Sequence, residues 1–207
     1  MNPDLFASVN INHLKKLAQK GLMAEHMIYV HNKLELMVAA GNPKAIKGVE
    51  DLGRDDLVQS HSNPLTEGIF KFYGSAMLKD LGLYEKVTAG KECKGCWAVE
   101  GKTWFTERHH RETPDRIENG KADVGIVWTS EVAHAIKEGR AIAGVAIPAP
   151  FNKQDEVAYA IGPMLSGRNA TNAKRFMTYL ATDQAQAIYA GYGFVPATKE
   201  ELKIKRL

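Results

Sequence analysis

The sequence contains only two cysteines, a mild net charge and no long apolar run, and each scarcity excludes a class of protein. No stretch approaches the roughly 18 consecutive apolar residues that a membrane-spanning helix requires. Met1–Ala7 lacks the charged start and the apolar run of a secretory leader. The formal net charge is +3, and the basic residues are interspersed with acids, so nucleic acid is not an expected partner.

What remains is an ordinary globular composition, with 44% hydrophobic and 25% charged residues among 207. This length suffices for one large or two small domains with a buried core. The sequence shows no nucleophile elbow, no phosphate loop and no convincing serine–histidine set or carboxylate pair. We therefore expect a protein that is not an enzyme and that carries no cofactor.

The two cysteines, Cys93 and Cys96, lie in a Cys-Lys-Gly-Cys pair that permits three interpretations. In an exported protein, the simplest is a local disulfide that closes a turn. The others are a free dithiol and a zinc site completed by His109 or His110, although adjacent histidines rarely both reach one metal. A thiol oxidoreductase is disfavoured, because the pair is not followed by a helix that would lower a thiol pKa.

The most informative segment is Glu112–Glu131, which predicts a short helix, a buried strand and the start of a second helix. Thr113 and Pro114 are suited to the start of the first helix, and Gly120 to its end. Val124–Trp128 is a near-continuous apolar run, typical of a strand covered on both faces. Because ligands of open α/β sheets bind at the carboxyl ends of strands, we expect a site here.

Periodicity and turn signals predict an α/β chain on either side of this segment. Helices are expected at Asn12–Lys20, at Glu67–Leu81 with Thr66 as the cap, at Glu131–Glu138, at Ala173–Leu180 and from Asp183 to Gly191. Strands are expected at Leu5–Ala7, Lys33–Ala40, Leu57–Ser60, Gly144–Pro148 and Val157–Ile161, with a hairpin formed by Trp97–Val99 and Thr103–Phe105.

Five segments, taken in order, match motif positions of one protein family. They are DLFAS from Asp4, the strand Leu34–Pro43, PLTEGIF from Pro64, ADVGIVW from Ala122 and the closing segment Gln184–Pro196. Over essentially the whole chain, this order resembles the type II solute-binding proteins of ABC uptake systems. The molybdate- and tungstate-binding proteins are the group that it resembles most.

The resemblance implies an α/β fold of two lobes, joined by a hinge of two crossing strands and closing on a ligand. Residues 1–47 and 147–207 would form lobe one, and residues 48–146 lobe two. Family members carry a strand, a helix and a second strand before the position of Asp4, and these hold two oxyanion-binding hydroxyl residues. The first lobe is therefore expected to be incomplete, and the edge of Leu5–Ser8 then invites pairing with a second copy in a homodimer.

The resemblance also implies a small oxyanion, such as molybdate or tungstate, held in the interlobe cleft by amides at helix starts. The ligand-binding residues that it implies in lobe two are Thr66, Glu67, Gly68, His110, Arg111 and Trp128. No metal is expected among them. Two departures from the family pattern stand out, because Glu67 brings a carboxylate to an anion site and Trp128 replaces a tyrosine. The expected partner is a membrane permease, and the expected location is periplasmic or extracellular.

Two alternatives stay open beside the oxyanion. The chain is either a binder of a different small solute on the same fold, or a zinc protein. The zinc ligands would come from His109, His110, Glu112 or Glu67, together with Cys93 and Cys96. Purely structural roles are also open, with Trp128 as a packing residue and Thr113 as a helix cap.

Overall fold

The computed structural model describes residues 2–207, which form two compact units. Unit 1 contains the residues up to Asn32 together with Gln154–Leu207, and unit 2 is the continuous segment Lys33–Lys153. Each unit has its own sheet flanked by helices, which confirms the predicted α/β class. No helix of residues 2–207 has both the length and the apolar character needed to cross a membrane.

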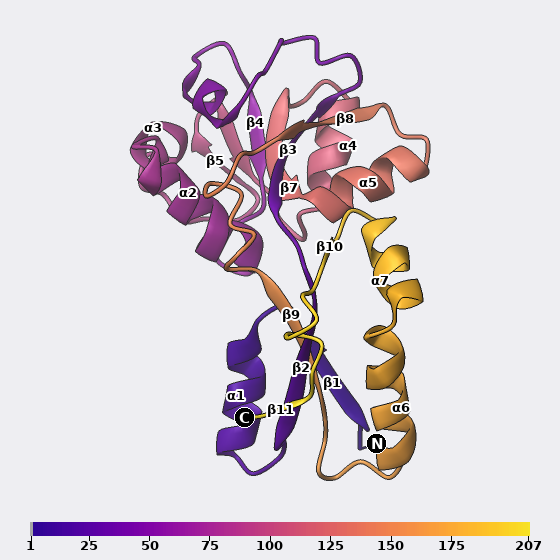
Figure 1. The fold of residues 1–207 in the computed structure, drawn as a ribbon. Coiled ribbons are helices and arrows are strands. Elements are labelled where there is room, and N and C mark those ends of the chain that lie inside the picture. Colours follow the sequence, from indigo (N-terminus) through magenta and orange to yellow (C-terminus); the bar gives the residue numbers. More distant parts are fainter. Residues whose placement is uncertain (1) are drawn as a thin grey trace. The chain divides into compact units, whose positions relative to one another are not determined.

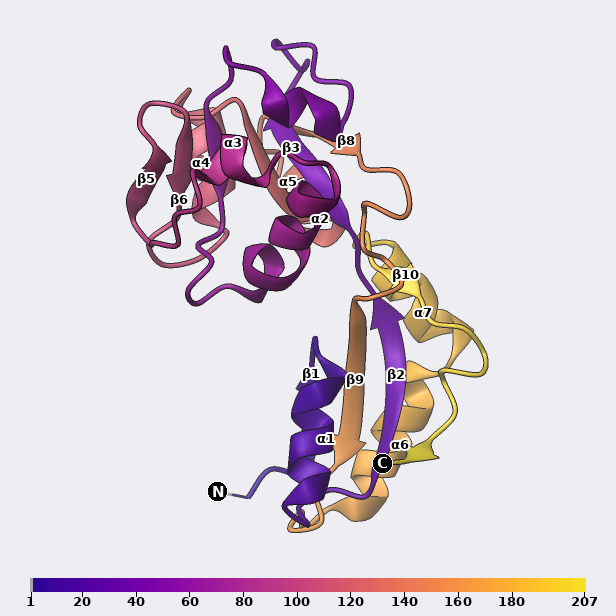
Figure 2. The ribbon, with the colours of Figure 1, turned by 90° about the vertical axis from the view of Figure 1, so that its left-hand side faces the viewer.

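The sheet of unit 1 is antiparallel, with the strand order β1-β9-β2-β10, and β11 also pairs with β2. Its strands are β1 (Leu5–Ser8), β2 (Glu25–His31), β9 (Ala158–Pro163), β10 (Val195–Pro196) and β11 (Lys205–Arg206). Its helices are α1 (Ile11–Gln19), α6 (Ala170–Leu180) and α7 (Asp183–Ala190). Helix α1 covers one face of this sheet and α6 covers the other (Figures 1 and 2).

Because side chains alternate along a strand, the strands of unit 1 place apolar residues on both faces of the sheet. Met27 and Ile161 pack against Met177 of α6, whereas Ala160 belongs to a cluster with Leu14 of α1. Strand β2, which lies between β9 and β10, was not among the strands predicted from the sequence.

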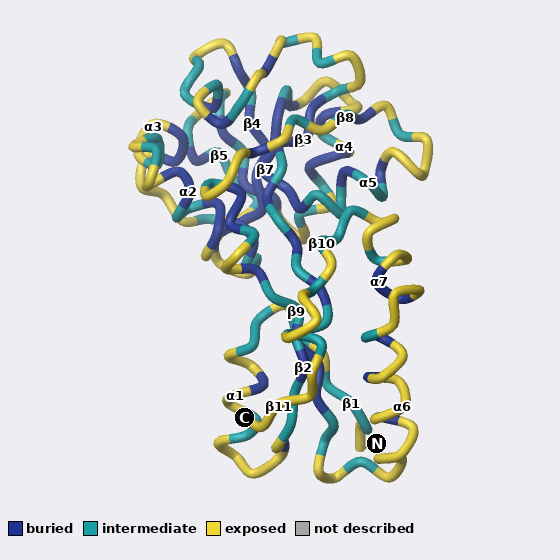
Figure 3. Tube along the Cα trace, viewed as in Figure 1, coloured by how far each residue is buried: buried dark blue, intermediate teal, exposed yellow. Residues whose placement is uncertain are grey.

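Unit 2 is built on a six-stranded mixed sheet with the order β5-β6-β4-β7-β3-β8. Its strands are β3 (Leu34–Ala39), β4 (Gln59–His61), β5 (Cys96–Val99), β6 (Thr103–Phe105), β7 (Val124–Trp128) and β8 (Ile142–Ala146). Strand β4 runs parallel to both β6 and β7, and the remaining pairs are antiparallel. The dark tube over β4 and β7 in Figure 3 shows that these central strands are buried.

The helices of unit 2 cover this sheet. They are a short 3-10 helix (Val49–Gly53), a π-helix (Ile69–Gly74) that continues into α2 (Ser75–Asp80), α3 (Tyr84–Thr88), α4 (Glu112–Glu118) and α5 (Thr129–Lys137). The single helix predicted over Glu67–Leu81 is therefore divided in two, with a π-helical first part. Wide helical turns of this kind are rare and are found frequently at functional sites.

The unit boundaries lie at residues 32/33 and 153/154, not at the predicted 47/48 and 146/147. The reason is strand β3, which was predicted to leave the first lobe. It pairs along its whole length with β7 and β8, and it is therefore a central strand of unit 2. Lys153 belongs to unit 2 as well, because its ammonium group lies 2.7 Å from Asp80.

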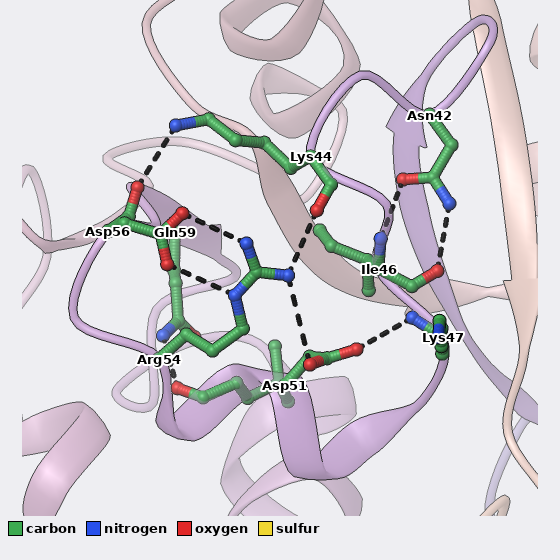
Figure 4. Close-up of polar contacts among 9 residues, drawn as sticks. Asn42, Lys44, Ile46, Lys47, Asp51, Arg54, Asp56 and Gln59 are labelled. Atoms are coloured by element: carbon green, nitrogen blue, oxygen red, sulfur yellow. Dashed lines mark hydrogen bonds and ion pairs between the residues drawn. The ribbon is translucent and has the colours of Figure 1, made fainter.

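The long connection from β3 to β4 is held together by Arg54 (Figure 4). Its guanidinium group donates two hydrogen bonds to the carboxylate of Asp56, at 3.0 and 2.9 Å, and a third to the carbonyl oxygen of Lys44. Asn42 closes a tight turn by bonding both the amide and the carbonyl of Ile46. These contacts order a segment that has little regular structure of its own.

Helix α4 packs closely onto the sheet, because Gly125 in β7 has no side chain. Thr113 lies inside α4, and its hydroxyl donates to the carbonyl oxygen of Ser60 in β4 at 3.3 Å. The prediction that Thr113 caps this helix is therefore wrong, since Arg111 stands at the cap position and the Thr113 side chain is fully buried.

The last residue of β4, His61, is fully buried. The Nδ1 atom of His61 accepts a hydrogen bond from the Ile126 amide at 3.1 Å, and Nε2 lies 2.9 Å from Oε1 of Gln59. Gln59 in turn donates to the carbonyl oxygen of Leu52 at 2.7 Å. Burial lowers the pKa of His61 to about 3, so this ring is neutral at pH 7 with its proton on Nε2.

The two cysteines, Cys93 and Cys96, are joined in a disulfide directly before and at the start of β5. Neither is therefore available as a thiol or as a metal ligand in this structure, which removes the dithiol interpretation and the cysteine part of the zinc alternative.

Replacing both cysteines with serine is expected to destabilise the chain by about 2 kcal/mol, because the disulfide closes a loop of only a few residues. Urea unfolding of the wild type and of the Cys93→Ser, Cys96→Ser double variant measures the difference. A wild type that loses several times this value on reduction would show that the bridge supports more than its own turn.

Candidate functional site

The carboxyl ends of three parallel strands, β6, β4 and β7, meet at one edge of the unit 2 sheet. Loops 106–111 and 62–68 follow β6 and β4 directly, and helix α5 begins immediately after β7. Ligands of α/β sheets bind at such an edge. The sequence-predicted residues from Thr66 to Gly68, from His110 to Arg111 and at Trp128 all lie in or beside these three segments.

His110 lies between two carboxylates at this edge. Its Nδ1 atom is 2.8 Å from Oε2 of Glu67, and its Nε2 atom is 3.2 Å from Oε1 of Glu131. All three side chains are largely buried, with exposed fractions of 14%, 14% and 17%. The two loops and the start of α5 are therefore linked by one polar triad, Glu67–His110–Glu131.

Burial by itself lowers the pKa of His110, but the hydrogen bonds to Glu131 and Glu67 outweigh burial, and its pKa is raised. For Glu131, burial acts to raise the pKa, yet the hydrogen bond and the charge of His110 leave it lowered. Both directions favour the charged forms of the pair.

A second imidazole lies beside the triad. The rings of His109 and His110 have centroids 3.6 Å apart and planes tilted by 39°. Burial lowers the pKa of His109, and the neighbouring His110 acts in the same direction. Ligand atoms of Glu67, His109 and His110 all lie within 4.8 Å of one another. The two adjacent histidines are therefore close enough to contact the same ion.

Several of the amides expected to hold an anion already have acceptors inside their loops. The amide and the hydroxyl of Thr66 both donate to Oδ1 of Asn63, and the Glu67 amide donates to the Asn63 carbonyl oxygen at 3.2 Å. The Thr113 amide donates to the carbonyl oxygen of His110. Gly68 has an ordinary helical φ of −60° and leads into the π-helix.

The other two predicted residues differ in exposure. Arg111 is 67% exposed, and its Nε atom is 3.9 Å from Oε2 of Glu131, so this ion pair is weak. Trp128 is only 7% exposed and contacts the ring of Tyr73 edge-on, with centroids 5.5 Å apart. Its place in the core accords with a packing role.

Sequence reasoning missed Glu131 and three buried polar side chains at this edge. The hydroxyls of Ser62 and Thr106 and the amide nitrogen of Asn63 are buried without a hydrogen-bond partner. Ser62 follows β4 and Thr106 follows β6, one position beyond the paired residues His61 and Phe105. The only signal in the sequence is that polar residues directly follow predicted strands.

Known proteins share both the sequence pattern and the fold of this chain. The family model described as "Bacterial extracellular solute-binding protein" matches residues 1–195. A sulfate-binding protein of Synechococcus elongatus is 27% identical over 203 residues, covering 92% of this chain and 56% of that protein. The chain thus spans little more than half the length of this relative.

Solved structures show the same fold. The substrate-binding domain assigned to a molybdenum ABC transporter of Clostridium difficile has a TM-score of 0.74 and 22% identity, covering 94% of this chain and 77% of that chain. The periplasmic molybdate-binding protein of Azotobacter vinelandii has a TM-score of 0.69 and 21% identity, covering 94% and 79%. These matches confirm the predicted two-lobed type II fold class.

The family match also confirms the expectation of a binding protein that is not an enzyme, because the matched family is described as solute-binding. The matched model covers nearly the whole chain and agrees with the resemblance seen in its motifs. The chain therefore belongs to the bacterial extracellular solute-binding proteins.

Proposed function

We propose that this chain is the solute-binding component of an ABC uptake system, that it works in the periplasm or outside the cell, and that its solute is a small oxyanion delivered to a membrane permease. The names of its relatives support this class of solute, since they include sulfate- and molybdate-binding proteins. Molybdate, tungstate and sulfate are the oxyanions to test.

The observation that carries the proposal is the set of donors without partners at the carboxyl edge of β4 and β6. The hydroxyls of Ser62 and Thr106 and the amide nitrogen of Asn63 are all donors, and an oxyanion offers only acceptors. Buried donors without a partner are rare in folded proteins and call for an explanation. Because the three side chains are inaccessible here, a solute reaches them only when the covering loops move.

The charges at this edge limit which part of it receives an anion. The carboxylate of Glu67 lies 2.8 Å from Nδ1 of His110, so that side chain is turned to an internal partner. Arg111 is the exposed cation of the same loop. We assign the oxyanion to the Ser62, Asn63 and Thr106 donors and to Arg111, with Glu67 and Trp128 outside its direct contacts.

A thermal-shift and calorimetric panel with molybdate, tungstate, sulfate and phosphate tests this assignment. A bound oxyanion at about 100 times its Kd is expected to raise the free energy of unfolding by roughly 2.7 kcal/mol. Ser62→Ala and Thr106→Val are each expected to weaken binding at least tenfold, since hydrogen bonds to charged groups contribute about 1.5–3 kcal/mol. Neither variant should destabilise the free protein, because neither donor has an internal partner.

The matched control is Ser75→Ala in the same unit, whose hydroxyl already donates to the Lys71 carbonyl oxygen at 2.7 Å. This variant should bind the oxyanion like the wild type. The proposal fails if no oxyanion of the panel raises the unfolding midpoint, or if both hydroxyl variants bind with unchanged affinity.

A further inference from the structure

We infer that unit 2 carries a site for a divalent transition-metal ion such as Zn²⁺, with Glu67, His109 and His110 as its protein ligands. One ligand atom from each of these residues lies within 4.8 Å of the other two. They come from two different loops, 62–68 and 106–111, that follow neighbouring strands of the sheet. The fold therefore assembles this group from distant parts of the sequence.

The donor set has the chemistry of a zinc site. Imidazole nitrogen and carboxylate oxygen bind Zn²⁺ at about 2.0–2.2 Å, and a set of three protein ligands leaves one coordination position open. Tetrahedral ligands at that distance are about 3.3 Å apart. The ligand atoms of Glu67, His109 and His110 now lie within 4.8 Å of one another, so small movements of these side chains suffice to enclose the ion.

Glu131 supplies the outer support that such a site requires. Its Oε1 atom lies 3.2 Å from Nε2 of His110, while Nδ1 of that ring faces Glu67. A carboxylate that accepts from one ring nitrogen directs the lone pair of the other toward the metal and fixes the orientation of the ring. The Nε atom of Arg111 lies 3.9 Å from Oε2 of Glu131, in a weak ion pair.

The balance of charge at the cluster also favours a cation. Two largely buried carboxylates, Glu67 and Glu131, share one imidazole between them, and Arg111 is mostly in solvent. A divalent ion between Glu67 and the two histidines offsets both negative charges at short range. This site differs from the zinc alternative that the sequence left open, because Cys93 and Cys96 are joined to each other and take no part.

The open coordination position gives the ion a second role, which rests on the proposed function. A bound Zn²⁺ ion would attract an oxyanion to an edge that otherwise presents two carboxylates. Metal binding itself does not depend on that role. Zinc is therefore tested alone first, and the oxyanions are tested afterwards with and without zinc.

Calorimetric titration of the metal-free full chain with zinc chloride tests the site. One ion per chain is expected to bind, and Glu67→Gln and His109→Ala are each expected to weaken its affinity at least tenfold. Glu131→Gln, which alters the outer support, is expected to weaken it about 10- to 100-fold. The matched control is His134→Ala, since His134 is a histidine of unit 2 outside the cluster, with its Nε2 atom 3.2 Å from Oε1 of Glu138.

Circular dichroism shows whether each variant is folded. X-ray absorption of the zinc-loaded wild type identifies the ligands without the use of any variant. The expected spectrum has two imidazoles and no sulfur. The inference is overturned if zinc does not bind, if the spectrum lacks two imidazoles, or if the affinity is unchanged in Glu67→Gln and His109→Ala. Zinc binding without any oxyanion binding would refute only the proposed function, and oxyanion binding in EDTA without zinc binding would refute only the metal site.

Discussion

Replacing Gly125 with alanine is expected to destabilise unit 2 by about 3 kcal/mol, the upper part of the range for overpacking a core. A Cβ atom at this position would overlap the carbonyl oxygen of Ser60 and the Cγ2 atom of Thr113. The first is backbone in the neighbouring strand β4, and the second lies in α4, which the Thr113 hydroxyl ties to the same carbonyl. Neither can move without separating the helix from the sheet.

Urea unfolding of Gly125→Ala, alone and combined with Thr113→Ser, measures this effect. The serine removes Cγ2 and keeps a hydroxyl, so it should restore part of the loss but not the part due to the Ser60 carbonyl. Gly68→Ala is the matched control, because a Cβ there meets the Phe72 ring at an ordinary 3.4 Å and φ is helical. A Gly125→Ala protein as stable as that control would refute the close approach.

Acid is expected to destabilise unit 2 through His61. The folded protein holds this ring neutral with a pKa of about 3, whereas an unfolded chain protonates it near pH 6.5. The unfolded state therefore binds more protons between these values, and stability falls as the pH falls through this window. The loss is about 2 kcal/mol at pH 5 and about 4 kcal/mol by pH 3.

The physical cause is the hydrogen bonding of the ring. Protonation would place an N–H on Nδ1, which now accepts from the Ile126 amide, so two donors would face each other in the core. Urea unfolding at pH 7 and pH 5 of the wild type and of His61→Gln isolates this residue. The wild type should lose about 2 kcal/mol more than the variant between these pH values. Parallel losses in both proteins would contradict the assignment.

The strands that the sequence predicted best are those that alternate least. Val124–Trp128 is apolar throughout and Leu34–Ala39 is apolar except at Glu35, because both strands lie inside the covered sheet of unit 2. Strand β2 was missed because Glu25–His31 begins and ends with polar residues and pairs at both sides only through segments far along the chain. No local pattern in the sequence predicts pairing between such distant segments.

The sequence predicted where the candidate site lies, but not which side chains contact one another there. The loops after β4 and β6 were recognised from turn residues and family motifs. Glu131 was described only as the start of a helix, and nothing within that segment indicates that its carboxylate contacts His110 in the loop after β6. The role of Thr113 was mistaken for a similar reason, because a threonine beside a proline fits a helix start. The deciding contact is with Ser60, distant in sequence.

The divided sequence of unit 1 sets the order in which the chain folds during synthesis. Strand β9 pairs with both β1 and β2, yet it is translated only after all of unit 2. Unit 2 is continuous, so all of its strands are present once Lys153 has emerged, and domains generally fold as units as the ribosome releases them. Until β9 follows, β1 and β2 have no partner between them. The strands β1 and β2 therefore complete their sheet only after the whole of unit 2 has been translated.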